Sequence, residues 1–197
     1  RTLTAAGARM LADRLNRPLT DRVEIDARLD TVAYCLDARD ARNAARMELR
    51  TAGDIERART RLALGRGGPR DLAAIAAGLK AGERAAARLG VASGAGLGSG
   101  FAGLPDQLER SLAALTLSAV PQLAKLANVI DRALTDTPPV HTREGGYVAP
   151  GFDAGLDAVR SLRSDARKLI AGLEARFQQE TGLTGLRIKH NNVLGYF

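Results

Sequence analysis

The sequence predicts an all-α protein with a multi-helix core, one unusually long helix and a short β segment at its C-terminal end. Hydrophobic residues make up 45% of the 197 residues, whereas aromatic residues make up only 4% and tryptophan is absent. Such a core must be built from Leu, Ala, Val and Ile, which favours packed helices over a β-sandwich. In addition, apolar residues recur at intervals of three and four through most of the chain.

The N-terminal part is expected to form two helices. The stretch "TAAGARMLADRLNRPL" carries apolar residues at helical spacing, and Pro18 ends it because proline cannot continue a helix. Asp21, with Glu24 three residues later, is typical of the start of a second helix. The apolar stripe of that second helix consists of Ile25, Leu29, Val32 and Leu36.

Three further helices are expected before residue 90. The third is "ARNAARMELR", and Gly53 ends it. Asp54 is expected to cap the fourth, "IERARTRLAL". The segment "GRGG" then interrupts the chain, and Pro69 is well placed as the first residue of a fifth helix that runs to about Leu89. The buried side of this helix is predicted to be formed by Leu72, Ile75 and Leu79.

A glycine-rich connector near residues 90–104 separates these helices from the next ones. Its "GVASGAGLGSG" run lacks the Gly-Lys-Ser/Thr of a phosphate-binding loop, so we interpret it as a flexible connector or a glycine-rich turn. Two helices, "DQLERSLAAL" and "VPQLAKLANVIDRAL", are expected after it. The glycines, prolines and β-formers of "HTREGGYVAPGFD" then predict a short extended segment with tight turns.

The strongest periodic signal predicts one long helix from about Asp153 to Thr181, which would span roughly 40 Å and end at Gly182. Its apolar stripe consists of Phe152, Leu156, Val159, Leu162, Ala166, Leu169, Leu173 and Phe177. Four cations lie off the stripe, and we interpret them as a solvated face rather than a ligand site: Arg160, Arg163, Arg167 and Lys168.

Charge and cysteine content narrow the function classes. The net charge of +7 is spread over mixed stretches, which permits a nucleic-acid partner and leaves a diffuse solvated charge as the alternative. No apolar run approaches the ~18–20 residues of a membrane span.

Cys35 is the single cysteine, so no internal disulfide exists, and we interpret it as a buried inert thiol in a reducing compartment. No catalytic triad, paired carboxylates or metal cluster stands out, so an enzyme is the least favoured class.

The chain closes on "LRIKHNNVLGYF", a β-like run with a polar centre. The sequence begins at Arg1 without Met and ends on Tyr196 and Phe197, which we interpret as a fragment of a longer protein. A strand needs a partner to satisfy its backbone groups. The expectation is therefore that the partner strands, and a helix returning along the long helix, lie outside this sequence.

Four stretches are informative together: "GARMLADRLNRPLTD", "DIERARTRLALGRGGPRDLAAI", "REGGYVAPGFDAGLDAVR" and "ETGLTGLRIKHNNVLGYF". In this order and at this spacing they resemble the middle of the MutS family of DNA mismatch-repair proteins, and the last stretch is the most specific. Two positions depart from the family pattern. Arg14 stands where an aromatic residue is usual, and Gly68 stands where a helix-capping serine is common.

The resemblance implies a helical core domain over residues 1–151, a long lever helix over 152–181 and the truncated start of a clamp domain over 182–197. In that family the lever couples ATP binding at one end of the protein to DNA gripping at the other. This chain is therefore expected to be mechanical and not an enzyme, with no cofactor of its own. The whole protein would bind ATP and Mg²⁺ elsewhere, because this sequence contains neither a phosphate loop nor the Phe-x-Glu mismatch-reading motif.

The partner that the resemblance implies is double-stranded DNA, held by its backbone without base reading. The expected contact positions near the clamp tip are Arg187, Lys189, His190, Asn191 and Asn192. Strand alternation would put Arg187, Lys189 and Asn191 on one face, and a plain turn at Asn191 and Asn192 is the alternative. A metal site at His190 is not expected, because no second ligand is suitably spaced.

The resemblance further implies a whole protein that forms a homodimer, binds MutL and acts in the cytoplasm at the bacterial nucleoid, without a membrane. The isolated chain is expected to self-associate through residues after about Phe152, because exposed apolar surface and strand edges recruit other chains. A free-standing basic helical module that binds protein or nucleic acid is the alternative function.

Overall fold

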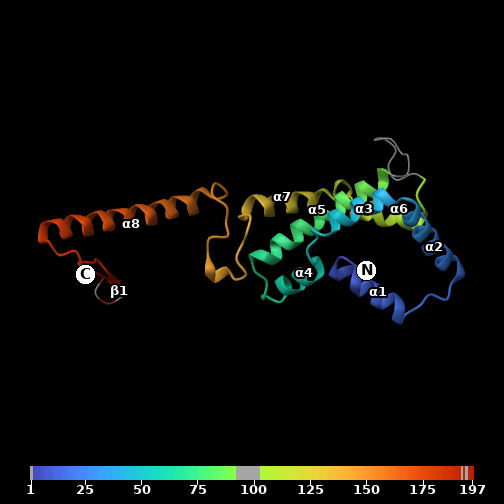
Figure 1. The fold of residues 1–197 in the computed structure, drawn as a ribbon, viewed down its shortest axis with the longest axis horizontal. Helices are drawn as coiled ribbons and strands as arrows, with labels where there is room; N and C mark the ends of the chain where they lie inside the picture. The colour runs from blue at the N-terminus through green and yellow to red at the C-terminus, as the bar shows by residue number, and fades with distance from the viewer. Residues whose placement is uncertain (1, 92–102, 192, 194) are drawn as a thin grey trace. The chain divides into compact units, whose positions relative to one another are not determined.

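The computed structural model describes residues 2–91, 103–191, 193 and 195–197, so most of the glycine-rich connector near 90–104 lies outside the described residues. The described chain is mainly helical, with a single two-stranded sheet, and this confirms the all-α fold class (Figure 1). It divides into two compact units, the helical unit over Arg1–Ala149 and a second unit over Pro150–Phe197.

Within its described residues, the helical unit contains every helix that the sequence predicts, with the fifth running slightly further, to Val91. Its elements in chain order are α1 (Ala5–Asn16), α2 (Arg22–Asp37), α3 (Arg39–Leu49), α4 (Ile55–Ala63), α5 (Pro69–Val91), α6 (Asp106–Leu115), the 3-10 turn η1 (Leu117–Ala119), α7 (Pro121–Ala133) and the 3-10 turn η2 (Thr142–Glu144).

The helix starts follow local capping chemistry. The Asp21 carboxylate accepts a hydrogen bond of 3.0 Å from the backbone N–H of Glu24, and the Asp54 carboxylate accepts one of 3.2 Å from that of Arg57. Each bond satisfies an N–H group that has no partner inside the helix. Pro69 is the first residue of α5, as predicted.

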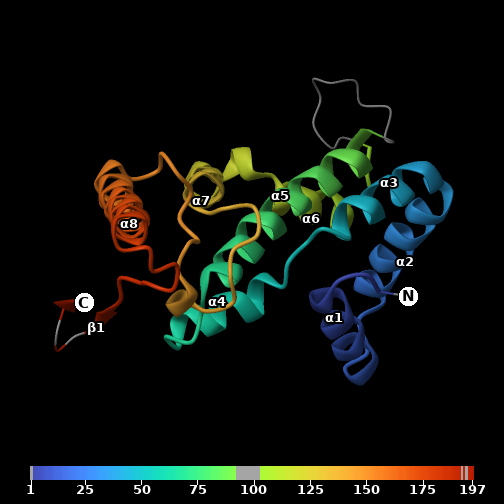
Figure 2. The same cartoon turned by 60° about the vertical axis from the view of Figure 1, so that its left-hand side comes forward.

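Helix α5 is the centre of the helical unit, and α3, α4, α6 and α7 all pack against it (Figure 2). Small residues permit this close packing. A Cβ atom at Gly53 would lie 2.4 Å from the carbonyl oxygen of Ala74, and one at Gly78 would lie 2.5 Å from the Ile55 side chain. The glycines therefore let the α4 segment approach the backbone of α5 more closely than any side chain would allow.

Two buried clusters lie along α5, one near its C-terminal end and one nearer its middle. One contains Ala86, Leu104, Leu108 and Leu112, and the half-buried side chains of Tyr34, Cys35 and Leu89 pack against it. The other contains Ala76, Ala127 and Ile130, and Leu72, Leu79 and Leu134 pack against it. Of the predicted buried side of α5, Leu72 and Leu79 pack against this cluster, and Leu72, Ile75 and Leu79 are all half-buried.

The predicted apolar stripe of α2 is not its packed face. Ile25, Leu29, Val32 and Leu36 are all exposed, whereas Tyr34 and Cys35 on another side of the helix contact the core. The Tyr34 hydroxyl also donates a 3.1 Å hydrogen bond to the carbonyl of Leu89. The buried face of α2 is therefore determined by its packing against α3 and α6, and not by the spacing of its larger apolar residues.

The second unit is built on α8 (Ala154–Thr181), a helix of 28 residues that confirms the predicted long helix. Its length is about 42 Å at 1.5 Å per residue. The Asp153 carboxylate caps its start by accepting a 2.7 Å hydrogen bond from Leu156. Gly182 ends it with φ of 72°, a left-handed conformation that favours glycine.

Candidate nucleic-acid interface

The segment after α8 folds back and is held by polar side chains of that helix. The Glu174 carboxylate accepts a hydrogen bond of 3.1 Å from the backbone N–H of Ile188. The Gln178 amide donates one of 2.9 Å to the carbonyl of Leu186. Leu186 and Ile188 are both half-buried. Two polar side chains near the end of α8 therefore hold the segment around Leu186 and Ile188 on the helix.

The C-terminal residues form a hairpin, which corrects the expectation of a strand without a partner. Strand β1 (His190–Asn191) pairs antiparallel with β2 (Gly195–Tyr196). Lys189 and Phe197 extend the ladder, since each backbone N–H donates to the other's carbonyl, at 2.8 and 2.9 Å. The chain thus supplies its own partner strand, because Gly195, with φ of 72°, allows the backbone to turn back.

The two cations of the hairpin segment differ in their surroundings. The Arg187 guanidinium lies 2.9 Å from the Glu174 carboxylate, so part of its charge is already compensated. The Lys189 side chain is exposed, and among the described residues it has no carboxylate within ion-pair distance. Of these two cations, Lys189 is therefore the one whose charge is not compensated by a described carboxylate. Whether Arg187, Lys189 and Asn191 share one face stays a prediction.

The remaining predicted positions are polar and surface-exposed, apart from one that is not described. The rings of His190 and Tyr196 meet edge to face with centroids 4.8 Å apart. The Asn191 side-chain oxygen accepts a 3.0 Å hydrogen bond from the backbone of Val193, and Asn191 pairs with Gly195 in the ladder. Asn192 lies outside the described residues. In the described part of the chain, no group of three His, Cys, Asp or Glu side chains could hold a metal ion.

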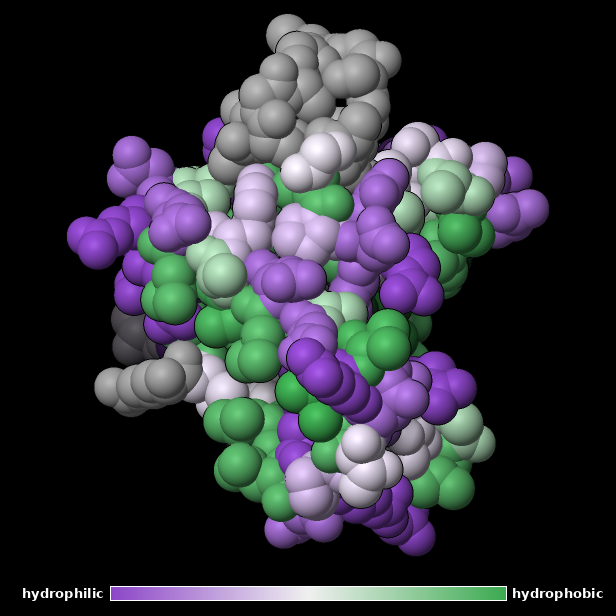
Figure 3. Space-filling model, turned by 90° about the vertical axis from the view of Figure 1, so that its right-hand side faces the viewer, coloured by the Kyte–Doolittle hydropathy of each residue, from purple (hydrophilic) through white to green (hydrophobic). Residues whose placement is uncertain are grey.

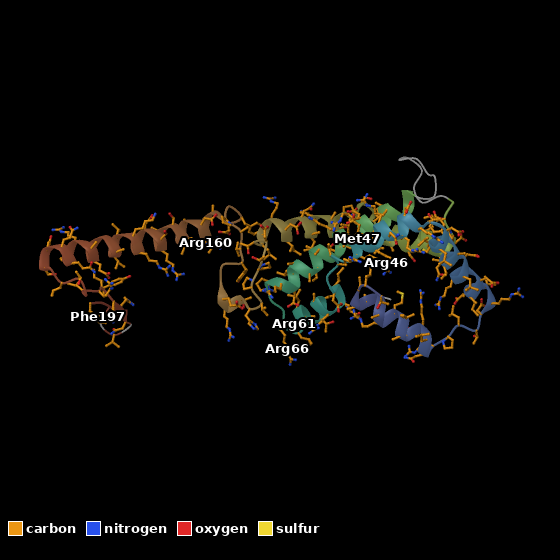
Figure 4. All side chains as sticks on the ribbon, in the orientation of Figure 1. Arg46, Met47, Arg61, Arg66, Arg160 and Phe197 are labelled. Atoms are coloured by element: carbon orange, nitrogen blue, oxygen red, sulfur yellow. The ribbon has the colours of Figure 1, made fainter. Side chains whose placement is uncertain are left out.

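A second group of cations lies along α8 and was interpreted from the sequence only as a solvated face. These cations are spaced three or four residues apart or are adjacent, and they line one shallow groove together with Ser164 and Ala171. They are Arg160, Arg163, Arg167 and Lys168. We call these four cations the basic face. Figure 4 labels Arg160 on α8 and Phe197 at the end of the hairpin, both in the second unit.

Sequence reasoning missed the side chains that organise the hairpin, above all Glu174. This residue lies 13 positions before Arg187 and 14 before Ile188, to which it is bonded. Glu174 and Gln178 are four residues apart and off the apolar stripe, which indicates a shared helix face. Nothing in that spacing identifies the returning backbone as their partner.

Many arginines of the helical unit are paired with carboxylates instead of facing solvent alone. The Glu48 carboxylate lies 2.8 Å from Arg84 and 3.1 Å from Arg88, and these bonds lower its pKa, with Arg84 contributing most. Arg61 lies 3.1 Å from Asp71 and donates to the carbonyl of Arg66 (Figure 4). The basic stretch "RARTRLALGRGGPR" is therefore partly neutralised by its own fold.

The thiol of Cys35, which the sequence predicts to be buried, is half-buried. It packs half-buried against the cluster around Ala86, and burial raises its pKa. A higher pKa means that less of the thiol is present as the nucleophilic thiolate. None of the described helices combines the length and the apolarity that crossing a membrane requires.

Comparison with known proteins assigns the family. Residues 1–185 match the family model described as MutS domain III. The whole chain is 49% identical, over 197 residues, to the DNA mismatch repair protein MutS of Caulobacter sp. (strain K31), of which it spans 21%. The chain therefore belongs to the MutS domain III family.

Proposed function

We propose that this chain is the core and lever part of a MutS-type DNA mismatch-recognition protein, and that it couples an ATPase elsewhere in that protein to a DNA-gripping clamp. The observation that carries the proposal is the family match over residues 1–185, together with a 28-residue helix that ends in a cation-bearing hairpin. As the chain spans 21% of its MutS relative, the ATP and Mg²⁺ site, the homodimer, MutL binding and action at the cytoplasmic nucleoid all belong to the proposal.

The mechanical role follows from the stiffness of α8. Its backbone hydrogen bonds are continuous from Ala154 to Thr181, so a displacement applied at one end is passed along about 42 Å of helix. At the far end, Glu174 and Gln178 hold the returning segment at Leu186 and Ile188 on the helix. The hairpin therefore moves with α8 as one body, as a rigid-body coupling mechanism requires.

The DNA contact in this proposal is electrostatic. Lys189 contacts a phosphate with its full charge. Arg187 contacts one with a charge that its ion pair with Glu174 partly compensates. His190 and Asn191 add hydrogen-bonding groups beside them, and Asn192, which lies outside the described residues, belongs to the same predicted set. Such contacts position a duplex without reading its bases.

Titration of the 197-residue chain with a matched and a mismatched duplex of equal length tests this assignment. We expect weak binding that is equal for both duplexes and falls as salt is raised. Lys189→Gln should weaken both complexes alike, whereas Arg14→Gln, a matched charge change on the exposed surface of α1, should have a smaller effect. A preference for the mismatch, or equal effects of the two variants, contradicts the proposal.

A further inference from the structure

Two of the four cations in the basic face of α8 have no compensating carboxylate among the described residues. Arg160 lies 3.1 Å from Asp157, and Lys168 lies 3.9 Å from Asp165. Arg163 and Arg167 have no carboxylate within ion-pair distance among the described residues. The stretch from residue 157 to 168 thus holds four cations against two carboxylates.

The arrangement of these cations fits an extended polyanion better than a single anion. Arg160, Arg163 and Arg167 follow one another along the helix, and the outer two are separated by about 10 Å of helix rise. The groove that they line is open along the side of a single helix. A lone phosphate bound by one of them would leave the others in water, whereas a chain of phosphates meets all of them.

The groove offers no aromatic ring on which a base could stack. Its remaining lining residues are Ser164 and Ala171, and no aromatic side chain is among them. Proteins that bind single-stranded nucleic acid combine a basic groove with aromatic rings on which the bases stack. A rigid row of cations without aromatic rings instead suits the outer backbone of a duplex.

We infer that the basic face of α8 binds the phosphate backbone of duplex DNA, as a second contact beside the one at the hairpin. This inference rests on the proposed function for the presence of DNA, but it concerns residues to which the hairpin assignment gives no role. The face lies on a different side of the helix from the apolar stripe through Leu162 and Leu169. Binding of DNA there leaves the stripe free.

The test is a salt titration of DNA binding by the 197-residue chain, measured as fluorescence anisotropy of a labelled, fully paired duplex. The variant Arg163→Gln/Arg167→Gln should lower affinity at low salt at least tenfold and reduce the slope of log K against log salt by about 1.8, two phosphate contacts at roughly 0.9 each. The control Arg14→Gln/Arg50→Gln removes the same charge from two exposed arginines of the helical unit that have no ion pair among the described residues. It should leave the slope nearly unchanged.

The outcomes separate this inference from the proposed function. A loss of DNA affinity in the Arg163→Gln/Arg167→Gln variant supports the inference. If Lys189→Gln then binds DNA normally, only the hairpin contact is overturned. A loss of DNA affinity in Lys189→Gln, with unchanged affinity in the Arg163→Gln/Arg167→Gln variant, overturns only the inference. Equal losses in the Arg163/Arg167 and control variants also overturn it, because net charge would then suffice.

Two competitors test the identity of the occupant. A single strand of the same length should compete less well than the duplex, and polyglutamate of equal charge should compete least. Tighter binding of the single strand contradicts the choice of a duplex. Equal competition by polyglutamate shows that an acidic protein segment fits this face as well, and overturns the assignment to DNA.

Discussion

The ion pairs of Arg9 show how single residues hold an element that has no buried side chains. The Arg9 guanidinium lies 2.8 Å from the Asp54 carboxylate and 2.7 Å from that of Glu56. No residue of α1 is buried. The hydrogen bond from Arg9 lowers the pKa of Asp54 from 3.8 to about 2, so α1 is joined to the start of α4 by charge.

Acid should release this connection. Because the folded pKa of Asp54 is below its unfolded value, the pair stabilises the fold fully above pH 4, and the contribution is lost as pH falls through about 2. Asp54→Asn keeps an N-cap side chain but removes the charge. We expect the difference in melting temperature between the unchanged chain and this variant to shrink between pH 5 and 2. A constant difference would mean that the charge contributes nothing.

The same substitution should have opposite effects at two glycines. Gly53→Ala places a methyl group 2.4 Å from the carbonyl oxygen of Ala74, so the backbone must shift, at a cost of about 1–3 kcal/mol. Gly172→Ala meets no atom within 4 Å and lies inside α8, where alanine is favoured by about 0.5–1 kcal/mol. Thermal unfolding followed by circular dichroism measures both. Equal shifts in the two variants would contradict the close packing of Gly53 on α5.

Local signals explain which elements could be predicted from the sequence. The ends of α8 depend on the Asp153 cap and on Gly182, which act within a few residues, so both were predicted correctly. The packed face of α2 depends on helices that are distant in the sequence, and the prediction from its apolar stripe was wrong. The hairpin contact with Glu174 is equally non-local, so the site residues were named without the side chain that positions them.

Helix faces differ greatly in what they contribute to stability. The Leu112 side chain in α6 is 3% exposed and lies in the cluster around Ala86, whereas Leu162 in α8 is 71% exposed. Leu112→Ala should therefore destabilise the helical unit by about 2–5 kcal/mol. Leu162→Ala should change stability by less than about 0.5 kcal/mol. Chemical denaturation of both variants checks this, and a large loss at Leu162 would show that the stripe is covered.

At the scale of the whole molecule, the amount of exposed apolar surface stands out. Large hydrophobic side chains of α1, α2 and α8 are exposed, and Figure 3 shows hydrophobic residues at the surface between hydrophilic ones. Monomeric proteins rarely leave contiguous apolar surface of this kind in water. The stripe of α8 is the most regular part of it, with Val159, Leu162 and Leu169 each more than half exposed.

The isolated chain should therefore self-associate through α8. Sedimentation velocity at rising concentration is expected to show a dimer or a larger species, and Leu162→Gln/Leu169→Gln should shift it toward the monomer. Met10→Gln/Leu15→Gln on α1 removes two similarly exposed side chains and serves as the control. A monomer at high concentration, or an equal effect of the control pair, would contradict association through the stripe.

The proposed coupling of DNA gripping to an ATPase through α8 can be tested by a break in that helix within the full-length protein. Ala166→Pro removes a backbone hydrogen bond in the middle of α8, at a cost of about 3 kcal/mol to the helix, and Ala166→Ser is the control at the same exposed position. The variant Ala166→Gly/Ala175→Gly softens the helix without removing a hydrogen bond, should the proline variant fail to fold. We expect basal ATP hydrolysis to persist in all three variants. Its response to mismatched DNA should be lost in the proline variant, reduced in the glycine variant and kept in the serine control. A full response to mismatched DNA in a folded proline variant would contradict coupling through α8.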